Sequence, residues 1–136
     1  MKWWQATGGI VVVVGLVLGA RLMGAVPAPK ISLQQFTALY ASSDPLVIDV
    51  REPSSYKRGH IKRAINVPLL SVQARADEIA ALARGRTVVT YCSCPDEHTS
   101  ALAALILVDH KIAKVYALIG GYPAWVRSGG ETEKNE

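Results

Sequence analysis

The sequence contains only two cysteines in 136 residues, Cys92 and Cys94, and a single residue separates them. There is no second cysteine pair, and the spacing is shorter than the Cys-x₂₋₄-Cys of most structural zinc sites. A zinc or copper site that adds Asp96 and His98 is therefore a minor alternative, and we expect no metal. A disulfide between the two cysteines is a further alternative, which an oxidising compartment would permit.

The chain also lacks a strong surplus of one charge. Its 15 basic and 11 acidic side chains give a formal net charge of +4. Lys2 and Arg21 flank an apolar segment, so from Lys30 onward 13 basic residues are balanced by 11 acidic ones. No basic stripe with interleaved aromatic residues is present, and we find no internal repeat. Nucleic-acid binding is therefore disfavoured.

Charge is absent altogether between Lys2 and Arg21, where "GGIVVVVGLVLGA" dominates. These 18 residues would span ~27 Å as a helix, close to the thickness of the hydrocarbon core of a bilayer. Trp3 and Trp4 stand where interfacial aromatic residues are expected. We therefore expect residues 1–24 to form a single transmembrane helix that anchors the chain to a membrane.

A cleaved secretory signal peptide is the alternative for residues 1–24, with Lys2 as its charged start. The segment contains no Ala-x-Ala cleavage signal, and Pro27 and Pro29 crowd the nearest sites, so the anchor is favoured. A short N-terminal tail before a first apolar run most often stays in the cytoplasm, which places the following domain on the periplasmic or extracytoplasmic side. Basic residues after the run oppose this orientation, so a domain that faces the cytoplasm remains an alternative, as does a secreted one.

Beyond a Pro/Ala linker at residues 25–30, short apolar runs alternate with helical patterns. Ser32 to Gln35 is a capping-box sequence, which predicts the start of a helix. Alternation of this kind predicts an α/β fold with a mainly parallel sheet. We expect one domain over 31–128 and a solvated, disordered tail over 129–136. The expected strands lie within 45–50, 64–72, 87–92 and 114–118, and the expected helices within 72–85, 99–110 and 120–130.

The stretch "VVTYCSCPDEHTS" carries the candidate chemistry, because a strand ends at Cys92 and a helix begins near Thr99. In parallel sheets, reactive residues collect at the carboxyl ends of strands. The backbone N–H groups of such a loop and the helix dipole lower the pKa of a cysteine thiol and also bind oxyanions. A thiolate there suits attack on sulfur, which gives a persulfide, or attack on phosphorus, which gives a phosphocysteine. A small buried cysteine without a chemical role is the plain alternative.

Four separated motifs follow one another over about residues 32–127: "VIDVRE", "GHIKRAINVP", "TVVTYC" and "KVYALIGGYPAW". Together they resemble the rhodanese-like domain family. "VIDVRE" is similar to the family's strand that ends in Asp-x-Arg, and "GHIKRAINVP" to its Gly-His-Ile signature. "TVVTYC" is similar to the strand that delivers the catalytic cysteine, and "KVYALIGGYPAW" to the closing segment. The resemblance implies a single α/β domain with a mainly parallel five-stranded sheet flanked by helices, and it implies no cofactor.

The resemblance also implies sulfurtransferase chemistry. A loop cysteine takes a sulfane sulfur from thiosulfate or a persulfide, holds it as a persulfide, and passes it to a thiol, another nucleophile or a partner protein. Counted from the strand, Cys92 matches the catalytic cysteine and is favoured; counted back from the helix, Cys94 matches instead. The implied substrate-binding loop consists of Ser93, Cys94, Pro95, Asp96, Glu97, His98, Thr99 and Ser100.

The loop departs from the family pattern because it contains no arginine, and Thr99 stands in the place of that arginine when counted from the helix. Asp96 and Glu97 would oppose a thiolate and repel thiosulfate if they lay near the sulfur, but would matter little if they pointed to solvent. A persulfide donor is therefore favoured over thiosulfate. We interpret the second cysteine as a resolving thiol that receives the sulfur or closes a disulfide.

Three further residues in the matching motifs receive structural interpretations. Asp49 and Arg51 are expected to fix the loops around the site, and His60 to be satisfied internally in a turn. A non-catalytic rhodanese-like module that binds a partner or senses redox state through Cys-x-Cys is the second functional hypothesis. A phosphatase or arsenate reductase ranks third, because an oxyanion clamp needs an arginine.

Overall fold

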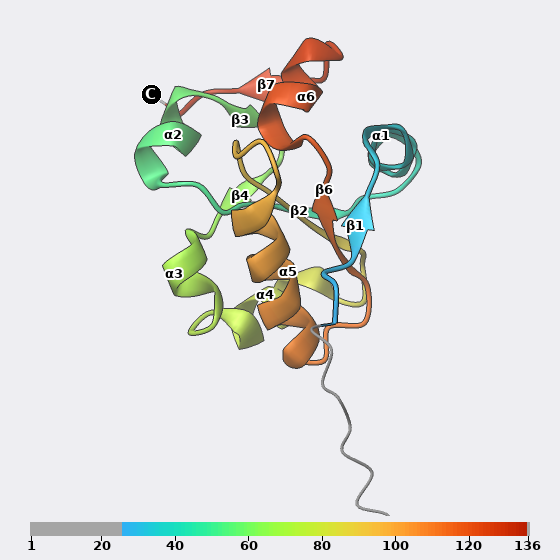
Figure 1. Ribbon diagram of the computed structural model, residues 1–136, viewed down its shortest axis with the longest axis vertical. Coiled ribbons are helices and arrows are strands. Elements are labelled where there is room, and N and C mark those ends of the chain that lie inside the picture. Colours follow the sequence, from blue (N-terminus) through green and yellow to red (C-terminus); the bar gives the residue numbers. More distant parts are fainter. Residues whose placement is uncertain (1–25, 136) are drawn as a thin grey trace, which may run out of the picture.

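The computed structural model describes residues 26–135 as short strands that alternate with helices (Figure 1). The expected transmembrane or signal segment at 1–24 lies outside the described residues. Within 26–135, no helix combines the length and the apolar character needed to cross a membrane. The strands are β1 (Lys30–Ile31), β2 (Leu46–Asp49), β3 (His60–Ile61), β4 (Ile65–Asn66), β5 (Val88–Tyr91), β6 (Val115–Leu118) and β7 (Thr132–Glu133). The helices are α1 (Leu33–Ser42), α2 (Pro53–Arg58), α3 (Leu69–Val72), α4 (Ala76–Ala83), α5 (His98–Asp109) and α6 (Gly121–Arg127).

Five of the strands form one sheet in the order β1-β6-β5-β2-β4, with every neighbouring pair parallel. The α/β class and the mainly parallel five-stranded sheet are thus confirmed. Strand β5 is central, and its last residue, Tyr91, lies opposite Asp49 at the end of β2. The carboxyl ends of β5 and β2 therefore meet at one edge of the sheet, where Cys92 follows directly. Strands β3 and β7 form a separate antiparallel pair.

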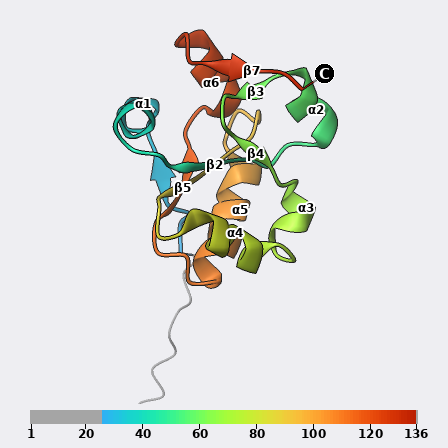
Figure 2. The ribbon, with the colours of Figure 1, turned by 180° about the vertical axis from the view of Figure 1, so that it is seen from behind.

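Helices cover both faces of the sheet, and Figures 1 and 2 show α1 on the opposite side from α3, α4 and α5. Successive strand residues point to opposite faces, so each strand contributes to two cores. Ile48, Val88 and Cys92 belong to the core beneath α3, α4 and α5. Val47, Val89 and Tyr91 belong to the core beneath α1 and α6, together with Phe36 and Trp125. The alternation along β5 therefore fixes the side of the sheet on which Cys92 lies.

Of the predicted helix boundaries, the start at Ser32 agrees with the structure, and the helix predicted over 72–85 differs from it. The predicted capping box is confirmed, because Ser32 Oγ accepts the N–H of Gln35 at 3.1 Å and Gln35 Oε1 accepts the N–H of Ser32 at 3.1 Å. The helix predicted over 72–85 is shorter in the structure. A turn separates α3 from α4, and α4 ends at Ala83, before Arg84 and Gly85 with positive φ.

The C-terminal residues are placed in the structure, in contrast to the disordered tail expected from residue 129. Strand β7 pairs with β3, and the indole N–H of Trp125 donates to the carbonyl of Glu131 at 2.8 Å. Glu133 Oε1 accepts the backbone N–H of Arg63 at 2.9 Å. Most of these partners lie about 70 residues earlier in the chain, so no local pattern in "ETEKNE" reveals them.

The segment between β6 and α6 closes over the end of β5. The N–H of Tyr122 donates to the carbonyl of Cys92 at 2.9 Å, and Gly121, at φ 53°, packs directly against the same carbonyl. A Cβ atom at Gly121 would overlap the Cys92 carbonyl oxygen. Glycine is therefore required there for close approach as well as for its backbone conformation.

Gly121→Ala is expected to lower the free energy of unfolding by roughly 3 kcal/mol, because left-handed strain adds to a clash with backbone. Gly129→Ala is the matched control. Gly129 also has positive φ, at 78°, but has no neighbouring atom within 4 Å of an added Cβ. The control should lose only about 1 kcal/mol, the cost of the backbone conformation alone. Chemical denaturation of both variants measures the difference, and equal losses would contradict this role for the close contact.

Candidate functional site

The loop from Cys92 to Glu97 joins the central strand to the N-terminus of α5. Cys92 is 2% exposed and belongs to the core beneath α5. Its Sγ lies 3.6 Å from Oγ of Ser100, a buried residue in the first turn of α5. Thr90, which lies on the same side of β5, donates its hydroxyl to the carbonyl of Ser100 at 2.8 Å. The sulfur of Cys92 is therefore held against the positive end of a helix dipole, where a thiolate is stabilised.

The two cysteines form a disulfide in the structure. Their Cα atoms are 5.7 Å apart, and Cys94, half-buried, packs against the same core as Cys92. The structure therefore represents the oxidised form of the loop, and Cys92 can act as a nucleophile only after reduction. Of the two sulfur-bearing side chains, that of Cys94 is the more exposed.

The carboxylate of Glu97 has two partners within the fold. It is 7% exposed, so it does not point freely into solvent. Its Oε1 accepts the N–H of Gly120 at 2.7 Å, and its Oε2 pairs with Nζ of Lys30 at 3.2 Å. Glu97 thus ties the loop to the closing segment and to β1, and Lys30 offsets its charge.

The other loop residues are more accessible. Ser93, Pro95, Asp96 and His98 are exposed, and Thr99 is half-buried. Asp96 Oδ1 accepts the N–H of His98 at 3.3 Å, which turns this carboxylate towards the start of α5. Within residues 26–135, no three His, Cys, Asp or Glu side chains gather as a metal site would require.

A buried ion pair lies beside the loop. The side chain of Asp49 is fully buried, and its Oδ2 accepts Nη2 of Arg51 at 2.6 Å and the hydroxyl of Tyr91 at 2.8 Å. Burial and the charge of Asp49 raise the pKa of Tyr91 far above its ordinary value, so the phenol stays a hydrogen-bond donor. The Tyr91 hydroxyl in turn accepts the N–H of Ile61 at 3.0 Å.

Arg51 extends this network to the loop. Its Nη2 donates to the carbonyl of Gly59 at 2.7 Å, and its Nη1 lies 3.3 Å from Oγ of Ser93. The guanidinium also lies over the ring of Tyr122, 4.2 Å from the ring centre. Burial acts to lower the pKa of Arg51, but the hydrogen bond and charge of Asp49 outweigh it and raise this pKa, so Arg51 stays charged.

His60 lies outside the loop and is fully buried. Its ring stacks on Tyr56, with ring centres 3.7 Å apart, and Nδ1 lies 2.8 Å from the Tyr56 carbonyl. Its Nε2 lies 3.3 Å from Oε1 of Glu133 in β7. Both ring nitrogens therefore have partners away from the cysteines, which suits a structural role.

A pocket of about 280 Å³ opens beside the loop. Its lining carries two guanidinium groups and no carboxylate, so it favours anions. Arg51 is already paired with Asp49, whereas Arg58 is exposed, and its one side-chain hydrogen bond within residues 26–135 goes to Ser55 Oγ at 3.1 Å. The sequence alone assigns no role to Ser55, Arg58 or Tyr122: Tyr122 stands in a matching motif, and the other two stand in the polar stretch 51–60. The lining consists of Arg51, Ser55, Arg58, Gly59, Ser93 and Tyr122.

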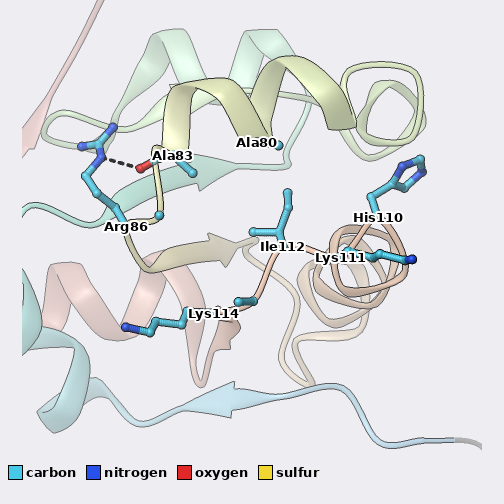
Figure 3. Close-up of a pocket in the computed structure, with 9 residues that line it drawn as sticks. Ala80, Ala83, Arg86, His110, Lys111, Ile112 and Lys114 are labelled. Carbon is cyan, nitrogen blue, oxygen red and sulfur yellow. Dashed lines mark hydrogen bonds between the residues drawn. The ribbon is translucent and has the colours of Figure 1, made fainter.

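Another pocket of about 280 Å³ lies at the opposite end of the sheet, between α4 and the segment from α5 to β6 (Figure 3). Arg86 precedes β5 and Lys114 precedes β6, so this pocket borders the amino ends of the strands. Neither cysteine lines it. The cysteine loop, rather than this pocket, is therefore the candidate site.

These features define an α/β domain with a cysteine at the end of its central parallel strand and beneath a helix N-terminus. Residues 32–128 match the family described as Rhodanese-like domain. The chain therefore belongs to the rhodanese-like domain family, as its sequence motifs indicate.

Individual relatives agree with this assignment. The chain is 34% identical over 92 residues to the uncharacterized protein YqhL of Bacillus subtilis, and the alignment covers 68% of each protein. It is 28% identical over 96 residues to the thiosulfate sulfurtransferase GlpE of Coxiella burnetii, covering 71% of this chain and 85% of that protein. The structure resembles the rhodanese-like domain of Alr3790 from Anabaena sp., with a TM-score of 0.67 and 27% identity, covering 78% of this chain and 79% of that one.

Arg51→Met is expected to lower the free energy of unfolding by roughly 3 kcal/mol, because it leaves the buried carboxylate of Asp49 without its cation. Arg75→Met is the control. Arg75 pairs with Glu78 on the surface, and loss of such a pair costs less than about 1 kcal/mol. Urea titration of both variants provides the comparison. A loss as small for Arg51→Met as for Arg75→Met would show that the buried pair does not hold this region.

Proposed function

We propose that this domain is a sulfurtransferase and that Cys92 is its nucleophile. The observation that carries the proposal is the position of Cys92, at the carboxyl end of the central strand and beneath the first turn of α5, in a rhodanese-like domain. The similarity to a thiosulfate sulfurtransferase supports the same reaction class. After reduction, the Cys92 thiolate attacks the sulfane sulfur of a donor. The bond between that sulfur and the rest of the donor breaks, and the donor leaves with the electron pair.

The donor is expected to be a persulfide, small or protein-borne, rather than thiosulfate. The loop itself has no arginine, and Arg51 is largely occupied by Asp49. Arg58 is the accessible cation of the adjoining pocket and offers one positive charge to an anionic donor. A thiol of a small molecule or a partner protein is the proposed acceptor.

A second candidate function is a redox-sensing or binding module without sulfur transfer. The Cys92–Cys94 disulfide favours it, since such a pair changes state with the redox poise of its surroundings. A phosphatase or arsenate reductase is less well supported, because no arginine lies in the loop to clamp a tetrahedral oxyanion.

The apolar segment at 1–24 supports a further part of the proposal, namely that the domain is tethered to a membrane as a single-pass protein. Its uncharged residues have the length of a bilayer core. An extracytoplasmic position of the domain would also agree with a disulfide in the loop.

Sulfur uptake is tested on chains that lack one cysteine. Reduced Cys94→Ser protein, incubated without oxygen with thiosulfate or with glutathione persulfide, is expected to gain one sulfur atom on Cys92. The double variant Cys92→Ser/Cys94→Ser is the control and should gain none. Intact mass spectrometry followed by peptide mapping reads out both. The Cys92→Ser variant is treated in the same way. If it gained sulfur on Cys94 while the Cys94→Ser variant gained none, Cys94 would be the nucleophile. If neither variant took up sulfur, the redox-sensing module would be favoured.

Thr99→Arg is expected to raise kcat/KM for thiosulfate by about tenfold, the equivalent of one charge-assisted hydrogen bond of ~1.4 kcal/mol. The reason is that Thr99, counted back from the helix, stands in the place of the family's arginine and lies half-buried in the first turn of α5. Leu102→Arg, at an exposed position one turn further along α5, is the matched control and adds the same charge away from the loop. Steady-state rates with thiosulfate and with a persulfide donor make the comparison. An equal gain for both variants would indicate a general charge effect instead.

A further inference from the structure

The loop brings the sulfur of Cys94 into bonding contact with that of Cys92. The two residues are joined as a disulfide although each is also held by other contacts. The carbonyl of Cys92 accepts the N–H of Tyr122 at 2.9 Å, and the carbonyl of Cys94 accepts the N–H of Glu97 at 3.4 Å. Glu97 is itself fixed by Gly120 and Lys30, so the loop is held at both ends.

We propose that Cys94 discharges the Cys92 persulfide within the same chain, so that the domain releases its sulfur as hydrosulfide and finishes each turnover as the Cys92–Cys94 disulfide. This inference rests on the proposed function, because it needs sulfur to be loaded on Cys92. In this refinement of the proposed function, an external thiol serves to reduce the disulfide and is not the direct acceptor of the sulfur.

The steps balance in atoms and electrons. The Cys92 thiolate first takes the sulfane sulfur, and the donor leaves with the electron pair, as sulfite if the donor is thiosulfate. The Cys94 thiolate then attacks Sγ of Cys92, the bond from Sγ to the outer sulfur breaks, and the outer sulfur leaves with that electron pair as hydrosulfide. The two cysteines lose two electrons in total, and the sulfane sulfur gains them. A dithiol reductant supplies two electrons and two protons to restore both thiols.

The structure favours attack on Sγ of Cys92 over attack on the outer sulfur. The disulfide joins the two Sγ atoms, so the loop as folded already places Cys94 on the inner sulfur. The outer sulfur of a persulfide would lie one bond further away.

The difference in burial also indicates which sulfur of the disulfide the reductant attacks. The half-buried Cys94 is the sulfur that an incoming dithiol can reach, whereas Cys92 lies beneath α5. Attack on Cys94 releases Cys92 as a thiolate at the helix N-terminus, which makes Cys92 the better leaving group. The reductant is therefore a dithiol that forms its mixed disulfide with Cys94, and the product of this step is Cys92 in its nucleophilic form.

A single-turnover experiment without oxygen tests this inference. The full chain is reduced, freed of reductant, and mixed with thiosulfate or glutathione persulfide, and a blank without protein is run beside it. Wild-type protein is expected to release one hydrosulfide per chain and to become the Cys92–Cys94 disulfide, because no other oxidant is present. Cys94→Ser and Cys94→Ala are both expected to keep the added sulfur on Cys92 and to release no hydrosulfide above the blank.

A positional control asks whether a nearby thiol is sufficient. In the double variant Ser93→Cys/Cys94→Ser the second thiol moves by one residue, to a side chain that in the wild-type structure lies 3.3 Å from Nη1 of Arg51. This variant is expected to hold its persulfide as Cys94→Ser does. A stable persulfide on wild-type Cys92, with no hydrosulfide, would overturn the inference while leaving the proposed function intact. Failure of both wild-type and Cys94→Ser proteins to take up sulfur would overturn both.

Discussion

The site depends on one buried charge, the carboxylate of Asp49 at the end of β2. An isolated carboxylate in such a position is strongly unfavourable, so the fold is stable only with Arg51 and Tyr91 in place around it. Tyr91 immediately precedes Cys92, and Arg51 contacts both Gly59 and the hydroxyl of Ser93. The requirement to neutralise one carboxylate thus fixes the end of β5, the turn before β3 and Ser93 of the cysteine loop in a single arrangement.

A second carboxylate, Glu97, explains how a loop without arginine keeps its shape. By sequence, the loop is acidic, and negative charge close to a thiolate would destabilise it. In the folded chain Glu97 is bound by Lys30 and by the N–H of Gly120, so its charge is balanced within the structure. The exposed Asp96 is the remaining acid of the loop, and solvent screens it. The electrostatic objection to a nucleophile at Cys92 is therefore weaker than the sequence indicates.

The parts of this molecule that follow local rules could be predicted, and those that depend on distant partners could not. Strand periodicity and the capping box at Ser32 are local signals, and with the family motifs they predict the sheet and the place of Cys92 at a strand end. The burial of Glu97 depends on Lys30, 67 residues earlier, and β7 depends on β3. The pocket beside the loop likewise needs Arg58 and Tyr122, which only the folded chain brings together.

The sequence leaves open which of the two cysteines is the nucleophile, and their unequal burial favours Cys92. A nucleophile benefits from the helix N-terminus that Cys92 occupies, and burial protects its persulfide from stray thiols. A sulfur that must be reached by a reductant has to be accessible, as Cys94 is. The same disulfide would also serve a redox sensor. The two functions differ in the species that takes two electrons from the cysteines. In a sulfur carrier that species is the sulfane sulfur itself, and in a sensor it is an external oxidant.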